Sequence, residues 1–229
     1  MPPTHILTDI EGTTTAIAFV HQRLFPYAAE ALEGFLARHV ARAEVAAILR
    51  DVPGEDKLGT LRAWMAEDAK VTPLKALQGL IWREGYAEGA LRGHLWPDVA
   101  PALQEWQAAG LRLAVYSSGS EEAQRLLFRH SEAGDLEGLF EGFFDTRMGG
   151  KREAASYARI AGAWRALPGA ILFLSDVAEE LDAAREAGLS TCQLVRLEDG
   201  TRPSGRHPEA ADFIGVTPCL QRSKGVAAR

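Results

Sequence analysis

Short apolar runs alternate with longer amphipathic segments over most of this chain. Each run suits a buried strand and is too short for a buried helix; the runs cover residues 5–8, 111–116, 171–174 and 191–195. Segments with helical periodicity or composition separate these runs. Because strand, helix and strand alternate, the pattern predicts an α/β fold built on a mostly parallel sheet.

Two segments carry the helical pattern on either side of the later runs. In residues 97–109 apolar side chains recur at i, i+3, i+4 and i+7 ahead of Gly110, a left-handed stop; they are Val99, Ala102, Leu103 and Trp106. We expect this stripe to pack on the sheet. Residues 177–187 are rich in Ala, Glu, Leu and Arg and end before Gly188, which predicts a second helix.

The segment between the first two runs carries almost no strand signal. It is too long for a crossover helix alone, so we expect a second structural unit there. Helical composition within it covers residues 19–49, 59–65 and 73–86. The chain is thus expected to be a Rossmann-like core with an inserted small helical cap, hinged near Thr15 and residues 93–97. The expected bounds are 1–16 and 93–221 for the core, 17–92 for the cap and 222–229 for a flexible tail.

Composition limits the class of protein and its partners. Of the 229 residues 47% are hydrophobic, which is ample for a buried core. A formal net charge of −6 argues against a nucleic-acid partner. No segment approaches the roughly 20 apolar residues that cross a bilayer, and the N-terminus lacks a signal-peptide pattern. We therefore expect a cytoplasmic monomer that binds neither nucleic acid nor membrane. Cys192 and Cys219 are not spaced as a zinc site, and a disulfide is not expected.

Polar residues follow the apolar runs at the predicted strand ends. Asp9 and Glu11 come after the first run, Ser117 after the second, and Asp176 after the third. Ligands gather at strand ends in open α/β sheets, where carboxylates can also hold a divalent cation. Lys151 stands after a glycine pair and ahead of a helical segment. Each residue alone is weak evidence for a functional site, but the whole set in this chain order is specific.

Each of these residues also has an ordinary structural explanation. Asp next to Gly and Thr is common in turns. Ser117 has about an even chance of being a helix N-cap if it stood alone. Lys151 alone would be a solvated surface lysine. The functional interpretation is favoured because the acids, the serine and the lysine occur together.

The set resembles the four sequence motifs of the haloacid dehalogenase superfamily of phosphotransferases. The matching positions span almost the whole chain and are residues 9–13, Ser117, Lys151 and Asp176. Three segments are similar to the enolase-phosphatase branch that serves methionine salvage, namely residues 9–14, 77–82 and 115–120. Glu11 stands where the superfamily usually has Asp, and it agrees with that branch.

The resemblance implies a role for each matching residue. Asp9 is the nucleophile that forms an aspartyl-phosphate, and Glu11 protonates the leaving oxygen and then activates water. One magnesium ion per subunit is held by Asp9, Asp176 and the backbone carbonyl of Glu11. The phosphoryl group is bound by the remaining residues, Ser117, Ser118 and Lys151.

The resemblance also implies a phosphorylated diketone with a methylthio group as the small-molecule substrate. Its enolisation needs a base and a group that polarises the carbonyl, and the base is left unassigned. Polar or aromatic candidates in the cap are Lys75, Gln78, Trp82, Glu84 and Tyr86. On an amphipathic helix, Trp82 is usually core, while Lys75 and Glu84 usually face solvent.

Three alternatives stay open. A magnesium-dependent phosphatase of the same fold would act on phosphoglycolate or a sugar phosphate without a carbon-acid step. A protein that only binds phosphorylated ligands is disfavoured by the intact acids and lysine. A dehalogenase needs no magnesium, which leaves Glu11 and Asp176 unexplained.

Other ionisable residues give a weaker signal. The six histidines show no paired spacing for a transition metal. Three acids follow Asp176 closely, and either one of them supports the metal from its outer shell or all are helix-start acids favoured by the dipole; they are Glu179, Glu180 and Asp182.

Overall fold

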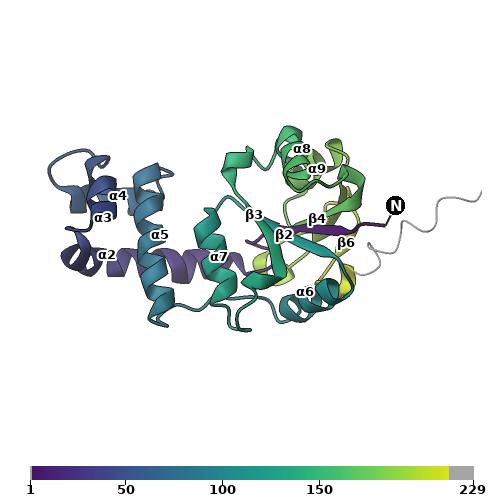
Figure 1. Ribbon diagram of the computed structural model, residues 1–229, viewed down its shortest axis with the longest axis horizontal. Coiled ribbons are helices and arrows are strands. Elements are labelled where there is room, and N and C mark those ends of the chain that lie inside the picture. The colour runs from purple at the N-terminus through teal and green to yellow at the C-terminus, as the bar shows by residue number, and fades with distance from the viewer. Residues whose placement is uncertain (1, 217–229) are drawn as a thin grey trace, which may run out of the picture. The chain divides into compact units, whose positions relative to one another are not determined.

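The computed structural model describes residues 2–216. Its sheet has six strands in the order β3-β2-β1-β4-β5-β6, and every pair is parallel (Figure 1). The strands are β1 (His5–Thr8), β2 (Arg112–Tyr116), β3 (Phe140–Phe144), β4 (Ile171–Ser175), β5 (Ser190–Leu194) and β6 (Glu209–Ala210). The α/β class and the parallel sheet predicted from the sequence are confirmed.

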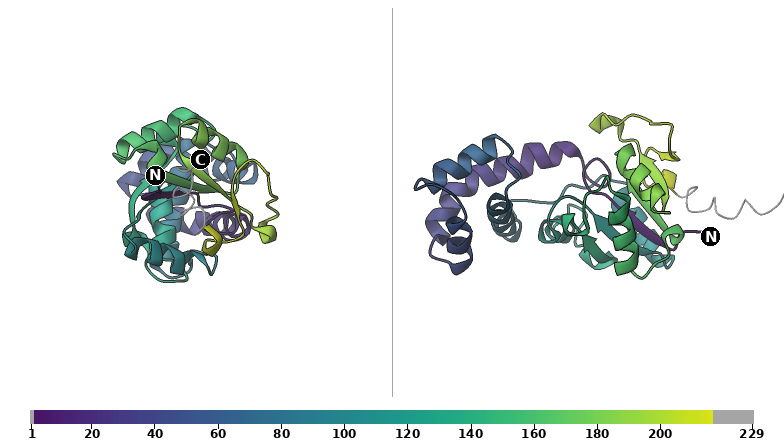
Figure 2. Two further views of the ribbon diagram at one scale, coloured as in Figure 1. Left: turned by 90° about the vertical axis from the view of Figure 1, so that its right-hand side faces the viewer. Right: turned by 90° about the horizontal axis from the view of Figure 1, so that it is seen from above.

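Helices cover both faces of this sheet. α8 (Ala154–Ala163) and α9 (Ala178–Glu186) lie on one face, and α6 (Val99–Ala108) lies on the other (Figure 1). Figure 2 shows the same layers from a second direction, with the green α8 and α9 on the side of the strands opposite the teal α6. The predicted helices at 97–109 and 177–187 correspond to α6 and α9. α7 (Glu121–Arg129) connects β2 to the segment before β3.

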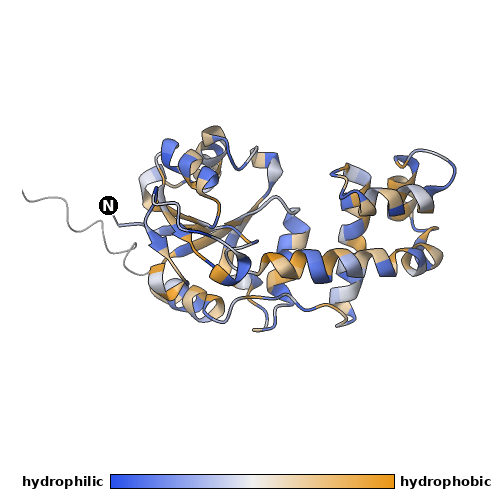
Figure 3. Ribbon diagram, turned by 180° about the vertical axis from the view of Figure 1, so that it is seen from behind, coloured by the Kyte–Doolittle hydropathy of each residue, from blue (hydrophilic) through white to orange (hydrophobic). Residues whose placement is uncertain are grey.

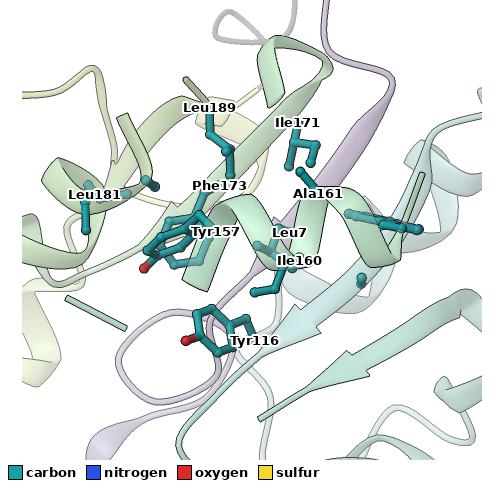
Figure 4. Packing of buried hydrophobic residues seen from close by; sticks show 13 residues of the cluster. Leu7, Tyr116, Tyr157, Ile160, Ala161, Ile171, Phe173, Leu181 and Leu189 are labelled. Atoms are coloured by element: carbon teal, nitrogen blue, oxygen red, sulfur yellow. The ribbon is translucent and has the colours of Figure 1, made fainter. Parts of the chain in front are cut away.

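The core under α8 and α9 is an apolar cluster formed by strands and helices together. Leu7 of β1 and Phe173 of β4 contact the helices, and both are fully buried (Figure 4). Ile160 of α8 and Leu181 of α9 are equally buried. Burying side chains of this size typically stabilises the fold by about 1.5–3 kcal/mol each.

Two strands were not predicted. β3 carries Glu141 and Gly142 in the middle of its phenylalanines, which interrupts the apolar run. β6 has two residues and no pattern that a window could detect. Both lie at the edges of the sheet, where the requirement for apolar residues is weakest.

The inserted segment Ala18–Arg92 forms a compact unit of its own. Its helices are α2 (Phe25–His39), α3 (Ala43–Arg50), α4 (Lys57–Ala66) and α5 (Thr72–Ala87), which pack around an apolar core. Figure 3 shows hydrophobic and hydrophilic stretches alternating along the helices of this unit. The helix expected over 19–49 is broken, because Arg42 adopts an extended backbone (φ −68°, ψ 134°) before α3.

The remaining short elements are turns of helix. They are α1 (Ile17–Phe19), the π-helix η1 (Val20–Leu24) and the 3₁₀-helices η2 (Glu137–Leu139), η3 (Thr146–Met148), η4 (Pro168–Ala170), η5 (Leu197–Asp199) and η6 (Ile214–Val216). No helix among the described residues is long and apolar enough to cross a membrane. Cys219 and the expected tail at 222–229 lie outside the described residues, and Cys192 is buried in β5.

Candidate functional site

The predicted site residues meet in one cavity. Asp9, Ser117 and Asp176 directly follow β1, β2 and β4, which are neighbours in the sheet, so these three residues lie at one edge of it. The cavity has a volume of about 460 Å³. Its lining includes all six residues predicted from the sequence, namely Asp9, Glu11, Ser117, Ser118, Lys151 and Asp176. Glu180, Thr146 and Arg152 also line it.

The loop after β1 brings the first acid close to the last one. The backbone N–H of Asp9 donates to the carbonyl of Leu174 in β4 (2.9 Å), which fixes the start of the loop. Gly12 has a positive φ of 71°, and a Cβ there would lie 2.4 Å from Oδ2 of Asp176. The N–H of Asp176 donates to the Thr13 hydroxyl (3.1 Å). A side chain at position 12 would therefore both strain the backbone and displace Asp176.

Lys151 is held between two carboxylates. Its Nζ lies 2.6 Å from Oδ1 of Asp9 and 2.7 Å from Oε2 of Glu180, and only 12% of its side chain is exposed. Burial alone would lower the pKa of Lys151, but the charges of Asp9 and Glu180 outweigh it and raise that pKa. The ammonium therefore stays charged, and the alternative of a solvated surface lysine is wrong.

The acids outnumber this one cation. Burial, followed by the charges of Asp9 and Glu180, raises the pKa of Asp176 to about 7. Burial and the charge of Asp9 likewise raise the pKa of Glu180 to about 7. Oδ1 of Asp176 is buried without a hydrogen-bond partner among the described residues. Buried carboxylate oxygens normally have a partner, so this site lacks positive charge.

A divalent cation fits that deficit. Mg²⁺ prefers oxygen ligands and typically binds through one or two carboxylates while keeping several waters. Asp9 and Asp176 offer such carboxylates, and the unpartnered oxygen of Asp176 is a free ligand atom. Within residues 2–216, no three His, Cys, Asp or Glu side chains already form a metal cluster. Carboxylate oxygens are ligands that suit Mg²⁺.

The serines after β2 divide two tasks between them. Ser120 caps α7, because its hydroxyl accepts from the N–H of Ala123 (3.3 Å). The alternative that Ser117 is the helix cap is therefore wrong. The Ser117 side chain is buried in the cavity wall and accepts from the N–H of Gly119 (3.1 Å). Ser118 is exposed and lines the same cavity.

One of the three acids after Asp176 belongs to the site. Glu180 is buried and accepts from the Ser175 hydroxyl (2.9 Å) as well as from Lys151. Glu179 instead pairs with Arg206 at the surface (2.8 Å). Asp182 pairs away from the cavity as well, with Arg185, Arg206 and His207. The spacing of four from Asp176 was the available signal, since it corresponds to about one helical turn.

Arg196 was missed by the sequence analysis. It is buried after β5 and forms a bidentate pair with Asp98 (2.9 and 2.7 Å). It also donates to the carbonyl of Thr13 in the loop after β1 (3.2 Å). Its guanidinium lies over the rings of Trp96 and Phe213. Arg196 thus holds the loop of Asp9 from behind the cavity, without lining it.

Two of the candidates in the helical unit, Trp82 and Glu84, have structural partners in that unit. Trp82 donates from Nε1 to the Leu24 carbonyl (2.9 Å). Glu84 is half-buried and pairs with Arg38 (2.5 Å) and His39 (2.6 Å), so the expectation of a solvated Glu84 is wrong. Lys75 is exposed as expected. Gln78 and Tyr86 are buried.

Comparison with known proteins places the chain among phosphate-processing enzymes. The profile of the haloacid dehalogenase-like hydrolases matches residues 3–188. Enolase-phosphatase E1 of Granulibacter bethesdensis is 61% identical over 94% of this chain and 95% of that protein. Enolase-phosphatase E1 of Acidiphilium cryptum is 56% identical over 96% and 97%.

Solved structures agree with the fold. The UTR4 protein of Saccharomyces cerevisiae superposes with a TM-score of 0.82 at 31% identity, covering 92% of this chain and 98% of that one. CbbY of Rhodobacter sphaeroides, solved in complex with phosphate, has a TM-score of 0.63 at 20% identity, covering 94% and 96%. The second likeness supports the fold alone.

Proposed function

We propose that this chain, which belongs to the enolase-phosphatases within the haloacid dehalogenase-like hydrolases, is an enolase-phosphatase of methionine salvage. It converts 2,3-diketo-5-methylthiopentyl-1-phosphate to 1,2-dihydroxy-3-keto-5-methylthiopentene by enolisation followed by dephosphorylation. The observation that carries the proposal is the convergence of five residues on one cavity in a chain that matches its relatives over nearly full length; the residues are Asp9, Glu11, Ser117, Lys151 and Asp176.

The dephosphorylation step runs through Asp9. Its carboxylate attacks phosphorus, an aspartyl-phosphate bond forms, and the ester bond to the substrate oxygen breaks. Glu11 gives its proton to that leaving oxygen and then removes a proton from the water that hydrolyses the intermediate. Both residues line the cavity, as this division of work requires.

The phosphoryl oxygens need positive charge and hydrogen-bond donors. Lys151 neutralises charge beside Asp9, to which it is already paired. The Ser117 hydroxyl and the Ser118 N–H donate to the phosphoryl group. Asp9, Asp176 and the Glu11 carbonyl would hold one magnesium ion, which would supply the remaining charge neutralisation when bound.

We propose that this protein also carries out the enolisation, and we assign no residue as the base that removes the carbon-bound proton. We propose that residues 17–92 are a cap domain that reads the methylthio end of the substrate, and that residues 1–16 and 93–221 are the core domain. The protein would work as a cytoplasmic monomer on a small molecule, without nucleic acid or membrane. A magnesium-dependent phosphatase of another ester remains the competing function.

One experiment tests the proposal. Purified protein is incubated with magnesium and the diketo phosphate while free phosphate and the absorbance of the enediol are followed together. Both products should appear with the unchanged protein, and both should be lost in Asp9→Asn. Phosphate released only from other esters would leave an ordinary phosphatase. Turnover that survives thorough chelation would contradict the metal assignments.

A further inference from the structure

The loop that carries Lys151 is short and irregular, yet its lysine is held within hydrogen-bond distance of two carboxylates. Two tyrosine hydroxyls meet the backbone of this loop. Tyr157 of α8 donates to the carbonyl of Lys151 itself (2.6 Å). Tyr116 of β2 donates to the carbonyl of Gly149 (2.8 Å). The two hydroxyls therefore bind the loop on either side of Gly150.

Both tyrosines belong to the apolar cluster under α8. Their side chains are fully buried and contact each other edge to face, with ring centroids 5.5 Å apart. Figure 4 shows them among Ile160, Phe173 and other apolar side chains. Phenylalanine would fill this volume without the cost of burying a hydroxyl, so packing alone does not require tyrosine. Burial raises the pKa of both tyrosines, so the hydroxyls stay protonated and able to donate.

The rest of the loop is tied to the same helix. Arg159 of α8 donates from Nε to the carbonyl of Met148 (2.6 Å). Gly149 has a φ of 113°, and a Cβ there would lie 2.2 Å from the guanidinium of Arg159 and 2.4 Å from the Ser156 hydroxyl. The loop thus lies directly on α8, and side chains bind three of its four carbonyls from Met148 to Lys151.

We propose that Tyr157, with Tyr116 in a supporting part, is a positioning residue that sets the place of Lys151 against Asp9. This inference rests on the role given to Lys151 in the proposed function. The Lys151 ammonium lies 2.6 Å from Oδ1 of Asp9, so a small shift of its backbone weakens that contact. Misplacement of a catalytic group by about 1 Å can cost on the order of a hundredfold in rate.

The first test is Tyr157→Phe, which removes one hydroxyl and keeps the ring. We expect kcat for phosphate release to fall about tenfold, with a smaller fall for Tyr116→Phe because Ser156 also bonds that hydroxyl. The matched control is Ile160→Val, which lies one turn along α8 in the same cluster and contacts no carbonyl of the loop. It should lower the melting temperature comparably and leave kcat unchanged.

A double-mutant cycle with Lys151→Met separates positioning from general weakening of the fold. If Tyr157 acts through Lys151, Tyr157→Phe should change kcat less than about twofold when Lys151 is already absent. If turnover of Lys151→Met falls below detection, the same cycle is read from the dissociation constant of inorganic phosphate, measured by calorimetric titration without substrate. In the kcat measurements, magnesium and substrate are kept at saturation for all four proteins.

The outcomes distinguish this inference from the proposed function. A Tyr157→Phe enzyme as active as the unchanged protein, or an equal loss with and without Lys151, would overturn the positioning role and leave the function standing. A loss equal to that of Ile160→Val at matched stability would overturn it as well. Full activity of Lys151→Met would show that Lys151 has no role in turnover. It would then contradict both the positioning role of Tyr157 and the part given to Lys151 in the proposed function.

Discussion

Lys151 and Arg196 are both largely buried cations of the core, but their surroundings differ. Arg196 has one carboxylate partner, Asp98, two aromatic rings and backbone carbonyls, and hydrogen bonds from Arg196 and the Phe213 N–H hold the pKa of Asp98 below its usual range. Lys151 shares its surroundings with three carboxylates, and the pKa values of Asp176 and Glu180 are raised to about 7.

The difference separates a pair that is complete from a cluster that needs a ligand. Around Arg196 the charges balance, as they must where a buried ion pair only holds the fold. Around Lys151 there is one ammonium for three acids, and an oxygen of Asp176 has no partner among the described residues. Such imbalance is typical of sites that bind a cation or a substrate, where perturbed pKa values concentrate. The contrast locates the chemistry without reference to any relative.

The largest expected effect comes from breaking the Lys151 cluster at its nucleophile. Asp9→Asn keeps the shape of the side chain but removes the attacking oxygen, so phosphate release should fall by at least about a thousandfold. Its stability should not fall, because one of three crowded acids is neutralised. Asp98→Asn is the matched change at the other cation. It should retain most of its kcat, and a thousandfold loss there would contradict the contrast.

The free energy of unfolding should change in the opposite way: Asp98→Asn should lower it and Asp9→Asn should not. The effect of Asp98→Asn should also depend on pH. Asp98→Asn leaves Arg196 buried with its charge uncompensated, which should cost about 3 kcal/mol at neutral pH. Since the pKa of Asp98 is lowered by folding, its contribution is present above the unfolded value of about 4 and is lost as the pH falls through the folded value.

Urea unfolding of Asp98→Asn and of the unchanged protein between pH 7 and pH 3 tests this pH dependence. The difference in the free energy of unfolding should be largest at neutral pH and should shrink as the pH falls below about 4. A difference that instead grows on acidification would show that Asp98 does not stabilise the fold as a carboxylate.

Metal binding should depend on the second acid of the cluster. Asp176→Asn removes one of two carboxylates proposed for magnesium, so the dissociation constant should rise at least about tenfold in calorimetric titration without substrate. Asp182→Asn, a surface acid two turns into the same segment, serves as control because its partners are Arg185 and Arg206. Equal affinities in the two variants would remove Asp176 from the metal site.

The sequence could predict those residues of the Lys151 site that stand at the ends of strands. Asp9, Ser117 and Asp176 come directly after apolar runs, so the edge of a parallel sheet brings them together. Lys151 needed its glycine pair and the family resemblance to be recognised. Three-dimensional neighbours could not be predicted in this way. Arg196 follows β5 with nothing in its spacing to connect it to the loop after β1, which lies far away in sequence.

The same limit applied to the fold. The apolar stripe of α6 was detected because its burial repeats with the helical period. The edge strand β3 was not, because Glu141 forms an ion pair with Arg112 across the strands instead of packing in the core. In the inserted unit, the half-buried Glu84 looked like a solvated residue until its partners in α2 were seen. Burial that depends on a distant partner leaves no periodic signal.

The smallest expected effect separates two adjacent acids at the start of α9. Glu180 is buried and pairs with Lys151, whereas Glu179 is exposed and pairs with Arg206. Glu180→Gln should lower kcat about fivefold, because Lys151 loses one of its two carboxylate contacts. Glu179→Gln should leave kcat within about twofold, since exposed ion pairs contribute little.

These neighbouring substitutions are a strict test because they share helix, side-chain length and chemical change. Any effect through the helix dipole or the stability of α9 should appear in both variants. Only a loss confined to Glu180→Gln therefore assigns this acid to the Lys151 cluster. If both variants lose activity equally, the first turn of α9 matters as a structural element, and Glu180 takes no separate part in holding Lys151 against Asp9.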